Sequence, residues 1–240
     1  MNTVGETTNT RKLALAAGVL YLVTFAASIP TLALKAPLVD HANWILGHGS
    51  DKGILVACLM DFICAVTGIG TAVALYPIVR RFSRGSAIGF ITSRTLEAAV
   101  LVMGAISLLT IVTLRNDAVG DTASLMTASR SLIAAHHWAF LFGPGCMPAI
   151  NAMFLASVMY RFRLVPRIIP AMGLVGAPLL LAAAVTVLFG GFTQTSTAAF
   201  LLTLPIAAWE FSVGVYMIVK GVNLPAVASD APAVSPALAA

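Results

Sequence analysis

A few ionisable residues inside long apolar runs are the places where this sequence could carry chemistry. Arg94 and Glu97 lie well inside the apolar stretch from Ser86 to Leu114, and Glu210 lies inside another apolar stretch. An ionised side chain near the centre of a bilayer costs about 3 kcal/mol to insert, so it is retained only where it faces other helices and finds partners. These residues are therefore the first candidates for a functional site.

Counting along the apolar runs places three polar residues at one depth. Arg94, Asn151 and Glu210 each lie ten residues from a basic residue at the end of their own run. At a helical rise of about 1.5 Å per residue, all three lie roughly 15 Å from that edge, near the middle of a membrane. Glu97 is one turn deeper on the same helix face as Arg94. We predict a buried polar cluster of Arg94, Glu97, Asn151 and Glu210.

The charge balance of this cluster suggests two roles. One guanidinium neutralises one carboxylate, which leaves one glutamate in excess and partly protonated in an apolar site. Proton-coupled sites are often built in this way. The alternative is a structural cluster that holds the helices together, with the extra glutamate neutral and hydrogen-bonded. The sequence leaves both interpretations open.

A second polar group is expected nearer the opposite face. It consists of Asp61 with His136 and His137, and cysteines stand one turn before and one turn after Asp61. Those cysteines splay to either side along a helix, so we predict no metal site. One interpretation is a proton-handling pair of Asp61 with a histidine. The interpretation that we favour makes the histidines interfacial groups and pairs Asp61 with Arg130.

The elements that position these residues are membrane spans. Of the 240 residues 59% are hydrophobic and 10% are charged, against about 25% charged residues in soluble domains. We predict an all-α bundle of six transmembrane helices over residues 11–220, with disordered tails at 1–10 and 221–240. A kink is expected in the fourth span, at Gly143–Gly145 and Pro148. The predicted spans are 13–34, 53–79, 86–114, 132–160, 168–189 and 198–219.

The basic residues predict the orientation of this bundle. Clusters at residues 11–12, 80–84, 161–167 and 220 all fall on one face, while the basic residues of the other face are balanced by aspartates. The positive-inside rule then places both termini in the cytoplasm and the bundle in the plasma membrane. Because the net charge of +5 is spread over short loops, it does not indicate a nucleic-acid partner.

Motifs of known enzyme classes are absent from the sequence. It has no G-x-S-x-G elbow, H-E-x-x-H pair, Walker loop, C-x-x-C-H haem site or Rossmann glycine pattern. We therefore assign no catalytic residue and no cofactor. Three classes stay open: a transporter or binding protein for a small molecule or a proton, a regulatory or scaffold protein, and a membrane-embedded enzyme. Nothing in the sequence indicates the oligomeric state.

Four separated segments carry a resemblance to a known family. They are YPIVRRFSRGSAIGFITSRTLEAAVLVMGAISLL from Tyr76, HHWAFLFGPG from His136, YRFRLVPRIIPAMGLVGAPLLL from Tyr160 and LPIAAWEFSVGVYMIVKG from Leu204. The chain resembles, from Arg11 to Gly221, the bacterial multi-pass membrane proteins grouped as domain of unknown function 4386. The resemblance implies a six-helix membrane domain. It implies no activity, ligand or catalytic residue.

Overall fold

The computed structural model describes residues 3–47, 49–117 and 120–224, and within these ranges the regular structure is entirely helical. Six helical segments are long and apolar enough to cross a bilayer, which confirms the predicted class of fold. The elements are α1 (Thr3–Val39), η1 (Ala42–Leu46), α2 (Lys52–Val79), α3 (Arg84–Asp117), α4 (Thr122–Phe142), α5 (Met147–Phe162), α6 (Ile168–Leu188) and α7 (Thr197–Val219).

The fourth predicted span is two helices, α4 and α5, joined by a tight turn. A Cβ on Gly145 would lie 2.5 Å from the carbonyl oxygen of Leu141, so only glycine fits there. Backbone bonds across the turn replace those lost from the helix, as from the Gly145 amide to the Phe140 carbonyl (2.9 Å). Pro148 stands in the first turn of α5, where no donor is needed. The expected kink is thus a break in the helix.

Three boundaries differ from the prediction. α1 begins at Thr3 and passes Leu34 to end at Val39, so Lys35 lies inside a helix. α4 begins at Thr122, ten residues before the predicted start of its span. Residues 221–224 of the predicted disordered tail lie against the bundle, where the Asn223 amide donates to the Leu164 carbonyl (2.8 Å). The rest of that tail, 225–240, lies outside the described residues.

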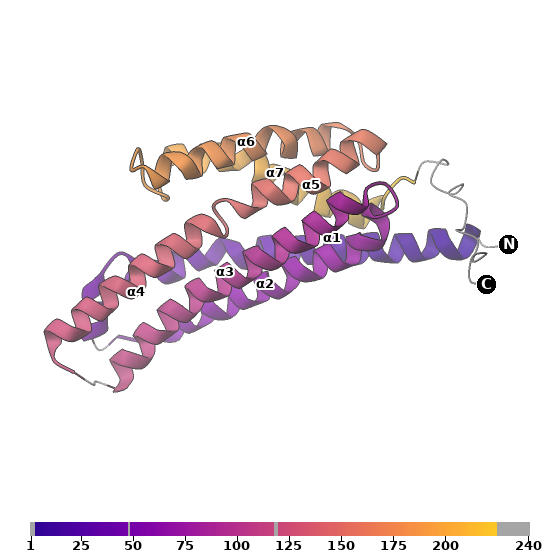
Figure 1. Cartoon of the computed structure of the whole chain (residues 1–240). Coiled ribbons are helices and arrows are strands. Elements are labelled where there is room, and N and C mark those ends of the chain that lie inside the picture. Colours follow the sequence, from indigo (N-terminus) through magenta and orange to yellow (C-terminus); the bar gives the residue numbers. More distant parts are fainter. Residues whose placement is uncertain (1–2, 48, 118–119, 225–240) are drawn as a thin grey trace, which may run out of the picture.

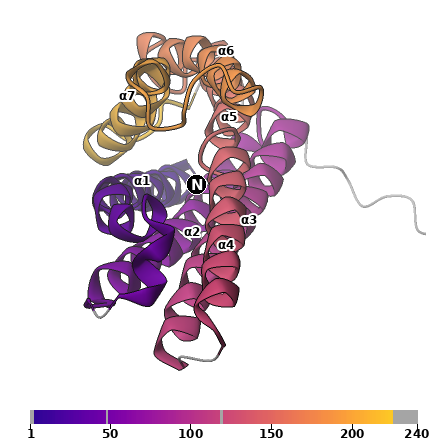
Figure 2. The same ribbon diagram turned by 90° about the vertical axis from the view of Figure 1, so that its left-hand side faces the viewer.

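The helices form two groups joined through α1, α3 and α5. α1, α2 and α3 pack side by side with α4 on α3, and α6 packs on α7 (Figures 1 and 2). α7 lies against α1, and α5 connects α3 to α6. We call the end at which α1 begins and α7 ends the near end, and the end that carries η1 the far end (Figure 1). α4 makes little contact with α6, so the two groups part toward the far end.

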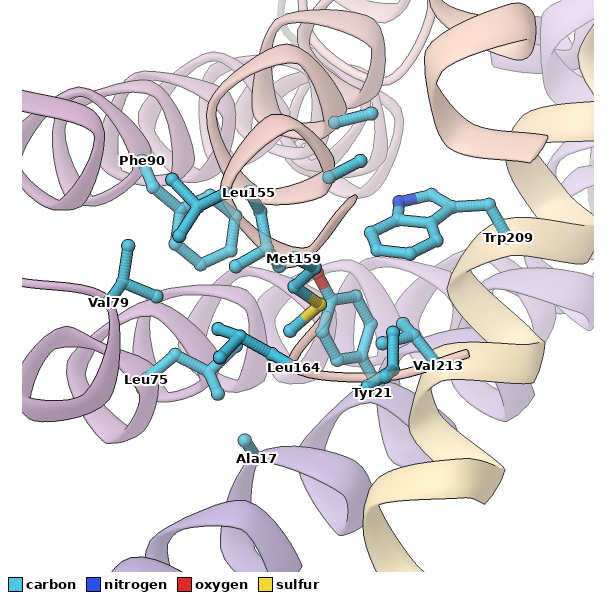
Figure 3. Packing of buried hydrophobic residues seen from close by; sticks show 14 of the residues in the cluster. Ala17, Tyr21, Leu75, Val79, Phe90, Leu155, Met159, Leu164, Trp209 and Val213 are labelled. Atoms are coloured by element: carbon cyan, nitrogen blue, oxygen red, sulfur yellow. The ribbon is translucent and has the colours of Figure 1, made fainter. Parts of the chain in front are cut away.

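Two apolar clusters fill the bundle. The larger one takes residues from α1, α2, α3, α5, α6 and α7, with Phe90, Leu155, Met159 and Trp209 among its most buried side chains (Figure 3). The smaller one lies toward the far end between α1, η1, α2, α3 and α4, around Leu38 and Leu108. Polar side chains that the sequence places in the spans lie between and beside these clusters.

Glycines allow α7 to lie close to α1. A Cβ on Gly18 would lie 2.7 Å from the carbonyl oxygen of Gly214, and a Cβ on Gly214 would lie 3.1 Å from Cβ of Tyr21. Small residues permit this close approach of membrane helices. At the near end Arg11 donates to the last carbonyls of α7, including that of Met217 (2.9 Å). These contacts fix α7 at the position from which Glu210 reaches α3.

Candidate functional site

Arg94 bonds two carboxylates at once. Its Nη1 donates to Glu97 Oε2 at 3.1 Å, and its Nη2 donates to Glu210 Oε1 at 2.7 Å. The first contact is made within α3 and the second joins α3 to α7. The structure therefore brings three of the predicted residues together, and they hold one positive and two negative formal charges.

The helix periodicity explains why these side chains point inward. Phe90, Arg94 and Ala98 recur at four-residue spacing on the buried face of α3. On α7, Glu210 follows the buried Trp209, three residues before the buried Val213. Because both faces are apolar apart from the ionic groups, the charges meet inside the bundle and not at the lipid.

Asn151 of α5 completes the predicted set, and we name Arg94, Glu97, Asn151 and Glu210 the Arg94 cluster. Asn151 Nδ2 donates to Glu97 Oε2 at 2.6 Å, and Ser93 Oγ donates to Asn151 Oδ1 at 2.6 Å. Ser93 Oγ also lies 3.1 Å from the carbonyl oxygen of Phe90. A hydroxyl has one hydrogen, so Ser93 donates to only one of these two acceptors at a time.

Aromatic rings cover the guanidinium. Its Cζ lies 5.2 Å from the ring centre of Tyr21 and 5.7 Å from that of Phe90, within the range of cation–π attraction. Both rings belong to the larger apolar cluster (Figure 3). The cation is thus held by rings on one side and by carboxylates on the other.

The carboxylates are less covered than the cation. The side chain of Arg94 is 5% exposed, whereas those of Glu97 and Glu210 are 14% and 21% exposed. The apolar cluster covers the near-end side, and the helix groups part toward the far end. The two carboxylates are therefore the more accessible part of the site, and the guanidinium is its most buried part.

Asp61 pairs with Lys35, and the expected pairing with Arg130 is wrong. The Lys35 Nζ lies 2.5 Å from Asp61 Oδ2, and both side chains are almost fully buried, whereas Arg130 is exposed. We name Lys35 and Asp61 the Lys35 pair. Lys35 reaches Asp61 because α1 continues beyond its predicted end and faces α2 there.

The two histidines differ from each other. His136 is buried, and its Nδ1 lies 3.0 Å from the carbonyl oxygen of Gly104 on α3. His137 is exposed, and its carbonyl accepts a bond from Gln194 in the α6–α7 loop (3.0 Å). His136 is therefore a core residue and not the interfacial group that we favoured. Among the described residues no three His, Cys, Asp or Glu side chains gather in a group that could hold a metal ion.

Sequence reasoning missed three residues of these sites: Lys35, Ser93 and Tyr21. A signal for Lys35 was present, because the buried face of α1 repeats every three or four residues through Ala14, Ala17 and Tyr21 and includes Thr31, Lys35 and Leu38. Lys35 falls on this face. Ser93 and Tyr21 carried no such signal, since hydroxyl groups are common in membrane helices and their partners come from other helices.

The comparisons with known proteins identify a family without an assigned activity. A family model described as Domain of unknown function (DUF4386) matches residues 16–221. No curated protein and no solved structure matches the chain. The match covers α1 from residue 16 onward and all of α2 to α7, including all residues of the Arg94 cluster and the Lys35 pair. The chain belongs to the family described as Domain of unknown function (DUF4386).

Proposed function

We propose that this protein binds and releases a proton at the Arg94 cluster, and that this step is linked to the passage of protons or of a small molecule across the membrane. The observation that carries the proposal is the charge count: one buried guanidinium contacts two carboxylates. A site that is apolar elsewhere favours a single negative charge beside a single positive one. The second carboxylate then holds the exchangeable proton.

Glu97 is the better candidate for the protonated residue. Its distance to Arg94 is 3.1 Å, against 2.7 Å for Glu210. The shorter contact is the stronger charge-assisted bond, so Glu210 acts as the lasting counterion of Arg94. Glu97 has in addition a neutral partner, Asn151, at 2.6 Å, a separation at which an O–H···O bond also forms.

Ser93 and Asn151 can satisfy Glu97 in both protonation states. With Glu97 ionised, Asn151 donates to Glu97 and Ser93 donates to Asn151. With Glu97 protonated, the side-chain amide of Asn151 turns over, so that its oxygen accepts from the Glu97 hydroxyl and its nitrogen donates to Ser93. Ser93 then donates to the Phe90 carbonyl at 3.1 Å. In each state Glu97, Asn151 and Ser93 stay hydrogen-bonded to one another, so the proton can come and go without breaking this chain of bonds.

A structural role is the second candidate, and one observation favours it. The cluster links α3, α5 and α7, which are distant in sequence, so its bonds also hold the helix groups together. The two roles make different predictions for Glu97→Gln. The amide resembles protonated glutamate, so a proton-binding site keeps its stability and loses its exchange, whereas a scaffold keeps its function.

Proton flux into vesicles tests the proposal. The protein is reconstituted into liposomes that contain a pH-sensitive dye, and a potassium gradient with valinomycin drives proton entry. We expect flux above that of protein-free vesicles for the wild type and none above that level for Glu97→Gln. Thr110→Val is the matched control, because the exposed Thr110 hydroxyl bonds only its own helix at the Ile106 carbonyl. Equal flux in Glu97→Gln and wild type contradicts the proposal, as does a wild type without flux.

A further inference from the structure

We propose that Lys35, Asp61 and His136 form a second proton-exchange site, through which protons pass between the far end of the bundle and the Arg94 cluster. The inference rests on the proposed function and extends it to a route. The Lys35 pair joins α1 to α2 at 2.5 Å, with side chains 5% and 4% exposed. His136 of α4 reaches the same stretch of α3 backbone as the residue one turn before Asp61: His136 Nδ1 lies 3.0 Å from the Gly104 carbonyl oxygen, and Cys58 Sγ lies 3.7 Å from that of Ala105.

The Lys35 pair is not needed to hold α1 and α2 together. α1 and α2 are consecutive antiparallel helices with the most extensive contact of any two helices in the bundle, so their association does not depend on an ion pair. A buried ion pair is weak evidence for stability, because apolar residues of similar size often serve as well. An ionisable residue inside a membrane helix is by default a candidate for a functional site, such as an ion or proton pathway. Retention of both charges therefore points to exchange.

The hydrogen bond of His136 defines which nitrogen is available. The carbonyl oxygen of Gly104 accepts only, so His136 Nδ1 carries the hydrogen of the 3.0 Å bond. In the neutral ring Nε2 is then the lone-pair nitrogen that can take up a proton. The ring centre of His136 lies 6.2 Å from that of the exposed His137. His136 is thus the group that can receive protons from the far end.

Among the described residues, Lys35 is the charged side chain that contacts Asp61. α1 contributes Lys35, and α2 carries the thiols of Cys58 and Cys64 one turn before and one turn after Asp61. α3 presents backbone at this level, where the Ala105 carbonyl accepts from Cys58 at 3.7 Å. A proton on Asp61 therefore has Lys35 as its main electrostatic counterpart.

A polar seam connects the two sites along the contact between α1 and α2. Tyr21, Thr24, Thr31 and Lys35 recur at helical spacing along α1. Across the contact, Thr24 Oγ1 lies 2.6 Å from Thr67 Oγ1 of α2. Cys64, one turn from Thr67, donates its thiol to the Thr24 carbonyl at 3.5 Å, and at the other end of the seam the Tyr21 ring lies 5.2 Å from Cζ of Arg94. The seam therefore spans the interval between the Lys35 pair and the Arg94 cluster.

The route runs in three steps. A proton from the aqueous phase at the far end adds to Nε2 of His136 and makes the ring an imidazolium. Transfer to the Asp61 carboxylate returns the ring to its neutral form and weakens the bond of Lys35 to Asp61. Release from Asp61 toward Glu97 restores the ion pair, and the reverse order carries a proton outward.

His136→Asn gives the sharpest test. The Asn amide nitrogen stands where Nδ1 stands, so the variant keeps a donor for the Gly104 carbonyl and loses Nε2. A second variant, Lys35→Met with Asp61→Leu, removes both charges together and leaves neither unpaired. In the vesicle assay we expect slower flux for His136→Asn and no flux above protein-free vesicles for the double variant. Thr110→Val is again the control, and thermal unfolding in detergent checks that each variant is folded.

The outcomes separate the two proposals. If Glu97→Gln loses flux while His136→Asn and the folded double variant keep the wild-type rate, the second site is wrong and the Arg94 cluster stands. If all of them keep the wild-type rate, both proposals fail. Should the double variant not fold, the rate of His136→Asn alone decides, because that variant leaves the ion pair intact.

Discussion

The two buried ionic centres of this bundle are built from similar groups but have different charge counts. The Arg94 cluster sets one cation against two carboxylates, takes its charged side chains from α3 and α7, and leaves the carboxylates 14% and 21% exposed. The Lys35 pair sets one cation against one carboxylate from two consecutive helices, at 5% and 4% exposure. The cluster can gain or lose a proton and keep Arg94 paired, whereas any change at the Lys35 pair breaks its only ion pair.

This difference suggests a division of labour. An excess carboxylate is the natural place to hold a proton, since one ion pair persists in both states. In a balanced pair the ion pair stays intact until its carboxylate is protonated. Such a pair therefore suits the transient transfer of a proton and not its long-term binding. Loss of the cation from the Arg94 cluster should therefore lower the stability of the fold far more than loss of both charges from the Lys35 pair.

Arg94→Gln should have the largest effect. It leaves Glu97 and Glu210 facing each other without a cation, and loss of one partner from a buried ion pair typically costs about 3–5 kcal/mol. We expect little folded protein in detergent, and recovery when both glutamates are also changed to Gln. The Lys35→Met/Asp61→Leu variant, which loses a balanced pair, should stay close to the wild-type stability. An Arg94→Gln protein as stable as the wild type would remove the basis for the comparison.

The two glutamates should differ from each other. Glu210→Gln takes away the 2.7 Å counterion of Arg94, and hydrogen bonds to charged groups contribute about 1.5–3 kcal/mol. Glu97→Gln replaces a residue that we hold to be protonated, so its unfolding temperature should equal that of the wild type. Thermal unfolding of both variants in one detergent makes the comparison. Equal losses in both would show that the two carboxylates share the charge of Arg94 evenly.

Gly18→Ala should have a smaller effect that is confined to the Arg94 cluster. The added Cβ meets the Gly214 carbonyl oxygen at 2.7 Å and Ile218 Cγ1 at 2.8 Å, so α7 must shift away from α1. Overpacking of this kind costs about 1–3 kcal/mol. Gly85→Ala is the control, since its Cβ would meet nothing within 4 Å. If Gly18→Ala unfolds at the same temperature as Gly85→Ala, the close approach of α1 and α7 does not position Glu210.

Asp121→Ala should have the smallest effect, and it calibrates pH experiments on the two centres. The Ser124 amide donates to this carboxylate at 2.7 Å at the start of α4, and the bond holds the pKa of Asp121 below its usual value. The stabilisation is present above the unfolded-state pKa and is lost as the pH falls through the lower folded-state pKa. We expect slightly earlier unfolding of the variant at neutral pH and none of that difference in strong acid. A pH-independent difference would mean that the carboxylate charge plays no part.

The sequence predicted those features that depend on local composition and on depth. Apolar length indicated the six spans, and counting from the basic residues placed Arg94, Asn151 and Glu210 at one level. In the structure Arg94 contacts Glu210 directly, and Asn151 joins them through Glu97. The prediction failed for Lys35, because a lysine near the end of an apolar run looks like the edge of a span. The continued helix and the facing Asp61 become visible only when α1 and α2 are packed together. The proton-binding role of the cluster stays a prediction.

Infrared difference spectroscopy of the reconstituted protein tests the central claim most directly. A step from high to low pH should produce a carbonyl-stretch band of a protonated buried carboxylic acid, with a shift in deuterated water. We predict that one component of this band is absent from Glu97→Gln and present in Glu210→Gln. A spectrum unchanged by Glu97→Gln would contradict the assignment of the exchangeable proton to the Arg94 cluster.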